Sequence, residues 1–311
     1  MTEEKGISVV VSTYSKEKKD EVLACIDSLR NQSFLPNEIL LILDHDKELI
    51  EFYKDSIPAD VQIVASDGFG LSFARNAGVK RAASEVVAFI DDDAVADKDW
   101  LRNLFKNYSD PSVVGVGGLV APMWAGGKPL WWLPEELNWV IGCSYKGGQS
   151  SRREVIRNPI GCNMSFRQSV FKDVGYFRHD VGRLGKVLLD GEEPEFSIRV
   201  HQKFPCFKII NEPSAIVHHK INPKRMNLKY VWKRAFYQGF SKALINETFE
   251  HDSQTLSVEH NYLRFLLTSS VKSRLRRFYH VKNLSQLATL FIASMFVFVG
   301  FAVGKVRKAV D

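Results

Sequence analysis

Three consecutive carboxylates, Asp91, Asp92 and Asp93, are the residues of this sequence that point most directly to chemistry. They follow the apolar run VVAFI at residues 86–90, which has the composition of a buried strand. Adjacent acids at the end of such a strand repel one another unless a cation or hydrogen bonds compensate their charge. Hard divalent ions prefer oxygen ligands, and Mg²⁺ usually takes one or two protein carboxylates together with phosphate oxygens. The run therefore favours a metal and phosphate site over its alternative, a solvated acidic turn that caps a helix.

Two further groups of residues have types that suit the same chemistry. Glu192 and Glu193 lie in the segment GEEPEF, where repulsion between neighbouring acids favours proton uptake. Alternatively, these acids begin a helix whose dipole favours them, with Pro194 at its first position. His219 follows a strand-like run at residues 215–217, and its imidazole suits Mn²⁺ better than Mg²⁺. The alternative for His219 is a hydrogen-bonded structural histidine.

The elements that must position these side chains alternate between strand and helix patterns. Buried-strand runs occur at residues 7–12, 38–43, 61–65 and 86–90, and helical patterns at residues 16–31, 71–83 and 98–108. This alternation predicts right-handed βαβ units and a mostly parallel sheet. Ligands of such sheets bind beyond the carboxyl ends of the strands, which selects residues 12–14, 44–46 and 91–93. Residues 115–148 are rich in Gly, Pro and Trp, and we expect irregular structure there that contributes to an acceptor site.

Composition limits the classes of protein that fit. A length of 311 residues with 45% hydrophobic content is enough for one large α/β domain with an appendage. A net charge of +6 suits nucleic acid, anionic lipid or phosphate-bearing substrates. The four cysteines are far apart and form no CxxC pair, which argues against a zinc site or a disulfide framework and favours a reducing, cytoplasmic compartment. The first residues lack the pattern of a signal peptide.

The C-terminal part carries an apolar segment with basic flanks. Residues 284–303 contain no charge, and a helix of this length just spans a bilayer core of roughly 30 Å. Basic residues precede and follow it, and residues 228–245 form a basic, aromatic-rich helical pattern. We expect a membrane helix that crosses the bilayer of the cell membrane, with the catalytic part on the cytoplasmic side. The alternatives are a helix that lies in the plane of the membrane surface and a buried core helix.

Five motifs occur in an order and spacing that resemble a known enzyme family. They are VVVSTYSKE, ILLILDHD, GLSFARNAGVKRA, VVAFIDDDA and GEEPEF. Together they resemble the family 2 glycosyltransferases of the inverting, GT-A type over roughly residues 6–220. The segments WWLPEELNWVIGCSYKG and IRNPIGCNMSFRQSVF are similar to those of archaeal enzymes that extend dolichyl-linked glycans, including the glucosyl-dolichyl phosphate glucuronosyltransferases.

The resemblance implies a role for each matching position. Asp93 falls where the family binds its metal, and Glu193 falls on the general base, with Glu in place of the usual Asp. His219 falls where a histidine approaches the metal or the diphosphate, and Glu192 is a neighbouring candidate for the base. The positions implied for the nucleotide and its ribose are Ser12, Thr13, Tyr14, Asp44, Arg75, Asn76, Asp91 and Asp92. Many relatives have a second acid where this chain has His45, which bears on uracil recognition.

Residues and resemblance together predict a Rossmann-like α/β fold of GT-A type. The expected parts are a catalytic domain at residues 1–225, a helical membrane-proximal region at 226–283 and a membrane helix at 284–304. The expected reaction moves a sugar, such as glucuronic acid or a hexose, from a UDP-type nucleotide sugar to a lipid-linked glycan with inversion, using Mn²⁺ or Mg²⁺. Its expected setting is protein N-glycosylation or surface polysaccharide synthesis at a membrane.

Two other functions remain as alternatives. A sugar-phosphate nucleotidyltransferase uses a similar α/β half, but the sequence has no Gly-rich GxGxR segment after its first strand. A non-enzymatic protein that binds membrane surfaces would explain the charge and leave the acidic motifs without a role. Nucleic acid is not an expected partner, because the sequence has no recognisable helix-turn-helix, RRM or zinc pattern.

Overall fold

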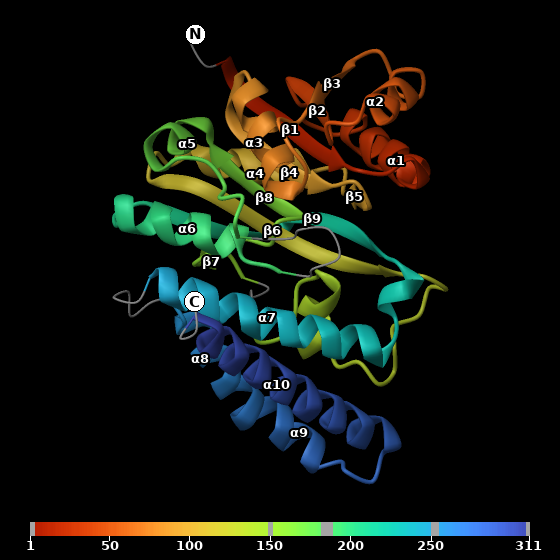
Figure 1. Ribbon diagram of the computed structural model, residues 1–311, viewed down its shortest axis with the longest axis vertical. Helices are drawn as coiled ribbons and strands as arrows, with labels where there is room; N and C mark the ends of the chain where they lie inside the picture. Colours follow the sequence, from red (N-terminus) through yellow and green to blue (C-terminus); the bar gives the residue numbers. More distant parts are fainter. Residues whose placement is uncertain (1–3, 149–151, 182–188, 250–254, 309–311) are drawn as a thin grey trace. The chain divides into compact units, whose positions relative to one another are not determined.

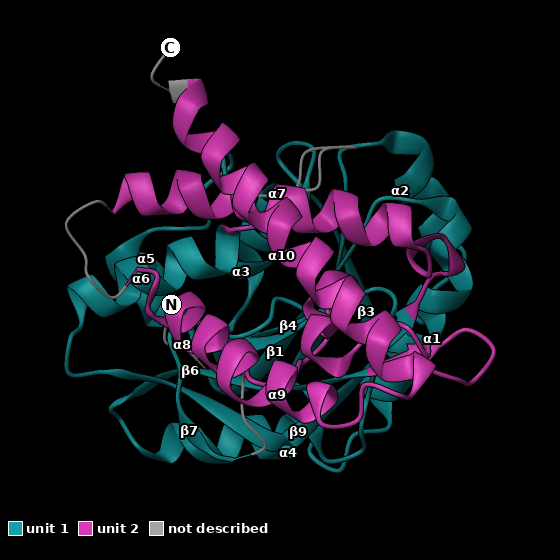
Figure 2. Ribbon diagram, turned by 90° about the horizontal axis from the view of Figure 1, so that it is seen from below, with its two compact units in different colours: residues 1–121, 151–185, 192–220 teal, residues 122–150, 186–191, 221–311 magenta. Residues whose placement is uncertain are grey.

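The computed structural model of this chain describes residues 4–148, 152–181, 189–249 and 255–308. The chain divides into two compact units (Figure 2). Unit 1 comprises residues 1–121, 151–185 and 192–220, and unit 2 comprises residues 122–150, 186–191 and 221–311. All the predicted site residues fall in unit 1, and the apolar C-terminal segment falls in unit 2.

The described residues form one sheet of nine strands (Figure 1). The strands are β1 (Glu4–Thr13), β2 (Glu38–Leu43), β3 (Val61–Ala65), β4 (Ser84–Asp91), β5 (Ala94–Ala96), β6 (Val113–Trp124), β7 (Glu154–Val155), β8 (Asn163–Arg167) and β9 (Lys208–Ile221). Their order is β3-β2-β1-β4-β8-β6-β9-β5, and β7 pairs with β9. The first four strands pair in parallel, whereas the pairs β4–β8, β6–β8, β5–β9 and β7–β9 are antiparallel. The sheet is therefore mixed, and the predicted parallel arrangement describes its first half.

Helices of unit 1 cover both faces of this sheet. They are α1 (Lys19–Arg30), α2 (Lys47–Lys54), α3 (Leu71–Arg81), α4 (Trp100–Phe105), α5 (Gln168–Val174) and α6 (Glu192–Lys203), with a short 3-10 turn, η1 (Lys16–Lys18), before α1. One core contains buried residues of α3, α5 and α6 with Val10 of β1 and Phe89 of β4. Because side chains alternate along a strand, Val9 and Val11 of β1 point to the opposite face, where α1 and α4 contact the sheet. Strands buried on both faces explain why their sequences are continuous apolar runs.

The glycine-rich stretch after residue 113 is a strand, which corrects the expectation of irregular structure from Gly115 onward. β6 runs for 12 residues, and its glycines mark places where neighbouring segments approach closely. A Cβ at Gly115 would lie 2.7 Å from the Phe166 ring, and one at Gly117 would lie 2.5 Å from Pro159 Cβ. Glycine here reflects tight packing rather than a turn, so its usual meaning as a breaker does not apply.

Unit 2 contains a 3-10 segment and a set of helices. They are η3 (Glu135–Ile141), α7 (Leu228–Thr248), α8 (Ser257–Phe265), the π-helical turn η5 (Leu266–Ser270), α9 (Val271–Leu275) and α10 (Val281–Lys308). Among the described residues, Val281–Arg307 is the one helical stretch long and apolar enough to cross a membrane by length and composition.

Glycines bring α7 and α10 close together. A side chain at Gly239 would overlap the carbonyl of Val297, and one at Gly300 would overlap the carbonyl of Phe236. A Cβ at Gly304 would lie 2.7 Å from Ala243 Cβ. Small residues that let two helix backbones approach in this way are a recurrent helix-packing device.

An ion pair holds η3 to α9 within unit 2. Glu136 is 1% exposed, and its carboxylate accepts hydrogen bonds from Arg274 at 2.8 and 2.9 Å and from the Ser270 hydroxyl at 2.8 Å. Gln286 of α10 accepts from Arg274 Nε at 3.1 Å and donates to the carbonyl of Trp131 at 2.9 Å. The tryptophan-rich segment is thus bonded to the helices that follow α7.

Candidate active site

The sheet brings three separate segments to the end of β4. Ser12 of β1 lies opposite Asp91 of β4, so the loop after β1 begins beside the three carboxylates. On the other side, Ala94 of β5 lies opposite His219 of β9, and the Lys220 N–H donates to the Asp93 carbonyl at 2.8 Å. These backbone pairings fix the positions of side chains that are far apart in the sequence.

Asp91, Asp93 and His219 form a group with the spacing of metal ligands. One ligand atom from each lies within 4.8 Å of the other two, and His219 Nε2 is 3.2 Å from Asp93 Oδ1. His219 is 2% exposed, so its ring is held by the surrounding protein. Two carboxylates and one imidazole are donors that suit Mn²⁺, and carboxylates also suit Mg²⁺. The residues present therefore fit a divalent cation of the predicted kind.

Lys18 provides a positive charge at the same carboxylates. Its ammonium lies 2.5 Å from Asp92 Oδ1 and 3.4 Å from Asp93 Oδ2. Burial raises the pKa of Asp92 to about 6, against the opposing effect of Lys18. Burial also acts to lower the pKa of Lys18, but Asp92 and Asp93 outweigh it, so this pKa lies above its ordinary value. Lys18 therefore remains an ammonium ion throughout the physiological range.

Arg75 lies among the acids of two motifs. Its guanidinium is 3% exposed and lies 2.8 Å from Glu193, 3.7 Å from Glu192 and 4.0 Å from Asp91. A side chain at Gly161 would overlap the Glu193 carboxylate and approach the guanidinium, so glycine leaves room for this ion pair. The resemblance places Arg75 on the nucleotide side, and the structure adds a direct contact with the predicted base. The guanidinium charge offsets the repulsion between neighbouring acids that the sequence suggested for Glu193.

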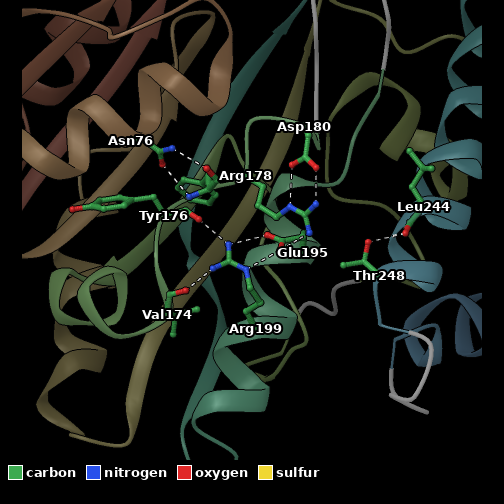
Figure 3. A network of polar contacts seen from close by, with 10 residues as sticks. Asn76, Val174, Tyr176, Arg178, Asp180, Glu195, Arg199, Leu244 and Thr248 are labelled. Carbon is green, nitrogen blue, oxygen red and sulfur yellow. Dashed lines mark hydrogen bonds and ion pairs between the residues drawn. The ribbon is translucent and has the colours of Figure 1, made fainter.

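Glu195, the third acid of the same motif, belongs to a different network (Figure 3). Arg199 donates to both of its carboxylate oxygens at 2.8 Å and also to the carbonyls of Val174 and Tyr176. Figure 3 shows Arg178 paired with Asp180 beside this group. Because Glu195 is 1% exposed and bound by Arg199, its contacts are structural. Glu192 and Glu193 are thus the acids of this motif that contact Arg75.

Asn76 also has a structural contact beside Arg75. Its side-chain amide donates to the Phe177 carbonyl at 2.8 Å and accepts from the Phe177 N–H at 3.0 Å. Asn76 is 4% exposed, and this pair of bonds fixes the backbone of Phe177 against α3. The resemblance placed Asn76 on the nucleotide side, and in the structure both ends of its amide are engaged with the protein backbone.

The remaining predicted residues lie at the ends of β1 and β2. Thr13 pairs with Leu43, so Asp44 follows next to the loop that begins with Tyr14. Tyr14 is 66% exposed. Burial raises the pKa of Asp44 above its ordinary value, and a 3.5 Å hydrogen bond from the Gly70 N–H partly opposes this.

Sequence reasoning missed Lys18 and Gly161. Lys18 is one of three lysines in the run Lys16–Glu17–Lys18–Lys19, and nothing in that run distinguishes the one that reaches Asp92. Gly161 lies in the segment NPIGCN, where the Asn-Pro dipeptide and the glycine that follows it suggest a turn. Its contact with Glu193 depends on the tertiary fold, so local spacing gives no signal for it.

Comparison with known proteins gives two kinds of likeness in sequence. The model of glycosyl transferase family 2 matches residues 8–175. A glucosyl-dolichyl phosphate glucuronosyltransferase of Haloferax volcanii is 32% identical over 302 residues, which cover 95% of this chain and 94% of that protein. The succinoglycan biosynthesis protein ExoM of Rhizobium meliloti is 25% identical over 241 residues, which cover 75% of this chain and 72% of that protein.

A solved structure shares the fold. The mannosyltransferase of Pyrobaculum calidifontis, in complex with GDP-mannose and Mn²⁺, matches 98% of this chain and 88% of its own, with a TM-score of 0.57 and 15% identity. This likeness confirms the predicted α/β fold of GT-A type. By its match to the family model and by its near full-length relative, the chain belongs to glycosyl transferase family 2.

Proposed function

We propose that this glycosyltransferase moves a sugar from a nucleotide diphosphate to a dolichyl-phosphate-linked acceptor, in a metal-dependent reaction that inverts the anomeric centre. The observation that carries the proposal is the convergence of Asp91, Asp93 and His219 within 4.8 Å, at the end of the strands where α/β folds bind nucleotides. The name of the Haloferax volcanii relative supports the dolichyl-linked acceptor.

Asp93 and His219 are the residues proposed to hold the cation, with Asp91 as a third ligand or as a partner of the ribose. A divalent ion bound there supplies positive charge to the departing diphosphate. The complex of the Pyrobaculum calidifontis mannosyltransferase, which shares the fold, contains Mn²⁺ and so supports Mn²⁺ as the cation proposed here. The imidazole of His219 also favours Mn²⁺ over Mg²⁺.

Glu193 is the proposed general base. It takes the proton of the acceptor hydroxyl, whose oxygen attacks the anomeric carbon while the bond from that carbon to the diphosphate oxygen breaks. Arg75, at 2.8 Å, orients the Glu193 carboxylate through a charge-assisted hydrogen bond. An acceptor that is itself a lipid monophosphate would attack as an anion and would not need this base.

The donor side is assigned to the loops after β1 and β2. Ser12, Thr13, Tyr14 and Asp44 are proposed to bind the base and ribose, with Asp92 on the ribose and Asn76 supporting the same side. We propose a UDP-sugar as donor. Since His45 stands where many relatives have a second acid, uridine and guanosine nucleotides should both be tested.

The experiment that tests the proposal uses the purified full-length protein with a panel of UDP- and GDP-sugars and Mn²⁺. Slow hydrolysis of one donor without acceptor, lost on chelation, identifies the sugar. Glucosyl-dolichyl phosphate and dolichyl phosphate are then compared as acceptors, because they separate a sugar hydroxyl from a lipid phosphate. No hydrolysis of any donor, together with pyrophosphate release from UTP and a sugar 1-phosphate, would replace this proposal with nucleotidyl transfer.

A further inference from the structure

The packing of α7 against α10 determines how α10 can meet a membrane. Trp232 of α7 stacks on Phe296 of α10, with ring centroids 5.9 Å apart. Further along, Gly300 lies against the backbone of Phe236, and Gly304 lies against Ala243. Residue numbers rise together on both helices, so α7 runs parallel to the second half of α10.

Ionised side chains of α7 therefore accompany the apolar run of α10. Arg234 is paired with Asp190, and Lys242 with Glu259, while Lys233 is exposed. All three basic residues lie between Trp232 and Ala243, the stretch that packs along α10. If the second half of α10 lay in the hydrocarbon of a bilayer, these charges would lie there too, where charged groups are strongly disfavoured.

The first half of α10 has polar neighbours as well. Gln286 and Thr289 are buried on its inner face, and Gln286 is bonded to Arg274, which carries the ion pair with Glu136. Leu290 and Ala293 continue the same buried face toward Gly300. One face of α10 thus packs against protein along the length of the helix. A single helix surrounded by lipid would contact lipid on all its faces.

The opposite face of α10 is apolar and uncovered. Its exposed members recur at helical spacing, with Phe291 74% exposed, Phe298 72%, Leu284 51%, Met295 48% and Val306 63%. α9 contacts α10 and lies beside it in both views (Figures 1 and 2). The segment from α8 to the start of α10 adds further exposed apolar residues, Leu267, Leu275, Phe278 and Tyr279.

The positive charge around this surface indicates an anionic partner. Between Glu259 and Asp311 the chain has nine lysines and arginines and no aspartate or glutamate. Lys272, Arg276, Arg277 and Lys282 are all exposed beside the apolar residues. Apolar residues flanked by cations suit the headgroup boundary of an anionic membrane, where the apolar side chains insert and the cations meet lipid phosphates.

We propose that α8, α9 and α10 form a binding surface for an anionic lipid bilayer, on which α10 lies in the plane of the membrane and does not cross it. This differs from the sequence-based expectation of a crossing helix. The reason is that the length and apolarity of residues 284–303 do not reveal that α7, with its charges, is packed along them. The inference concerns unit 2 alone and does not depend on the proposed reaction.

The first test is the sidedness of the two ends of α10. Single cysteines replace Lys282 and Arg307 in a Cys206→Ser background, since the other cysteines are buried. In sealed vesicles from expressing cells, a membrane-impermeant maleimide should label both positions equally, because both ends of α10 lie on the same side of the membrane. The Cys206→Ser protein without a new cysteine is the control. Labelling of one position and protection of the other until detergent is added would show a crossing helix and overturn the proposal.

The second test is lipid charge, using sedimentation of the full-length protein with vesicles. Vesicles of phosphatidylcholine mixed with phosphatidylglycerol should bind it more tightly than phosphatidylcholine alone. Each cation near an anionic surface contributes about 1 kcal/mol, or about five-fold, so R276Q/R277Q should weaken binding by about 30-fold. The matched control K98Q/K203Q removes two exposed lysines of unit 1 and should leave binding unchanged. Equal binding of R276Q/R277Q and wild type would contradict the proposal.

A third variant separates lipid from a second copy of the chain as the partner. F291S/F298S removes two exposed rings without touching the core, and should weaken binding to both kinds of vesicle, whereas the control Leu35→Ser in unit 1 should not. Circular dichroism checks that the fold is retained. If F291S/F298S instead converts a dimer to a monomer and leaves vesicle binding intact, the surface is a protein interface and the lipid proposal is wrong.

Discussion

Asp93 contacts two side chains at the end of β4, the His219 imidazole at 3.2 Å and the Lys18 ammonium at 3.4 Å. A change at this residue therefore alters the charge of the whole cluster, whereas Asp92, which is 3% exposed, is bound mainly by Lys18. The neighbouring carboxylates thus have different environments although they are adjacent in sequence. Individual substitutions can distinguish their roles.

Asp93→Asn should abolish sugar transfer and weaken binding of UDP in the presence of Mn²⁺. The neutral amide removes the charge that a cation bound to a diphosphate requires, and loss of outer partners alone typically costs 10–100-fold in metal affinity. Isothermal titration with UDP and Mn²⁺ measures the effect, and Asp173→Asn, at an exposed acid on α5, is the control. Near-full activity of Asp93→Asn would rule out its proposed role.

Glu193→Gln should retain donor binding and lose turnover by about 10²–10⁴-fold, the usual cost of removing a general base. Glu192→Gln is the matched variant, since Glu192 also faces Arg75 but at 3.7 Å. Initial rates with a hydroxyl acceptor are compared with thermal unfolding of each variant, because Arg75 loses a charged partner in both. Unchanged turnover of Glu193→Gln, with a large loss in Glu192→Gln, would show that Glu192 is the general base.

At the scale of elements, we expect the ion pair between η3 and α9 to contribute to the free energy of unfolding. Arg274→Met leaves the buried Glu136 carboxylate without its cation, which should cost about 3–5 kcal/mol of unfolding free energy. The double variant E136Q/R274M should recover part of this loss, since no unpaired charge remains. Urea unfolding followed by tryptophan fluorescence measures both, with the exposed Arg264→Met as the control. An equal loss in the single and double variants would contradict the prediction.

The same pair predicts a pH dependence. Burial acts to raise the pKa of Glu136, but its bonds from Arg274 and Ser270 outweigh burial and lower it below the ordinary value of 4.5. Stability from this group is therefore complete above pH 4.5 and is lost as the pH falls below that value. Wild type should lose more stability than E136Q/R274M between pH 5 and pH 3. Parallel pH profiles of the two proteins would show that the pair contributes nothing.

Substitutions of the glycines between α7 and α10 should destabilise the protein to different extents. Gly300→Ala places a methyl group on the Phe236 carbonyl, whereas Gly304→Ala meets the Ala243 side chain at 2.7 Å and can be relieved by a small shift. Overpacking typically costs 1–3 kcal/mol, so we expect Gly300→Ala to be clearly the more destabilising. The same urea series gives the order, and equal effects would mean that the helices separate freely.

Much of the fold could be predicted from sequence, for reasons that differ between elements. β2 and β3 have the bounds expected for them, because each is an apolar run that ends at turn-forming residues. The sequence-based expectation does not include the short helix α2, although Asp46 caps it by accepting from two backbone N–H groups. The sequence predicts irregular structure where β6 lies, because glycine usually interrupts strands, whereas the glycines of β6 mark close packing. The carboxylates of the candidate site can be predicted because ligands of α/β sheets bind beyond the carboxyl ends of the strands. The contact of Arg75 with Glu193 joins residues 118 positions apart, so it cannot be predicted without the tertiary fold.

At the scale of the whole molecule, chelation should separate activity from folding. The core of unit 1 is built from apolar residues of the sheet, α3, α5 and α6, and none of its members is a proposed metal ligand. EDTA should therefore abolish donor hydrolysis without changing the circular dichroism spectrum, and Mn²⁺ or Mg²⁺ should restore the activity. Hydrolysis that persists in excess chelator would show that the acids act without a metal.

Lys18 has a consequence for the order in which ligands arrive. Its ammonium already occupies the neighbourhood of Asp92 and Asp93, so the carboxylate cluster is partly neutralised before any cation enters. A divalent ion arriving alone would meet a like charge, whereas one that carries a nucleotide diphosphate brings anionic oxygens for the ammonium to contact. We therefore expect weak binding of Mn²⁺ by itself, strong binding of the metal–nucleotide complex, and a compulsory kinetic sequence in which donor and metal enter as one species.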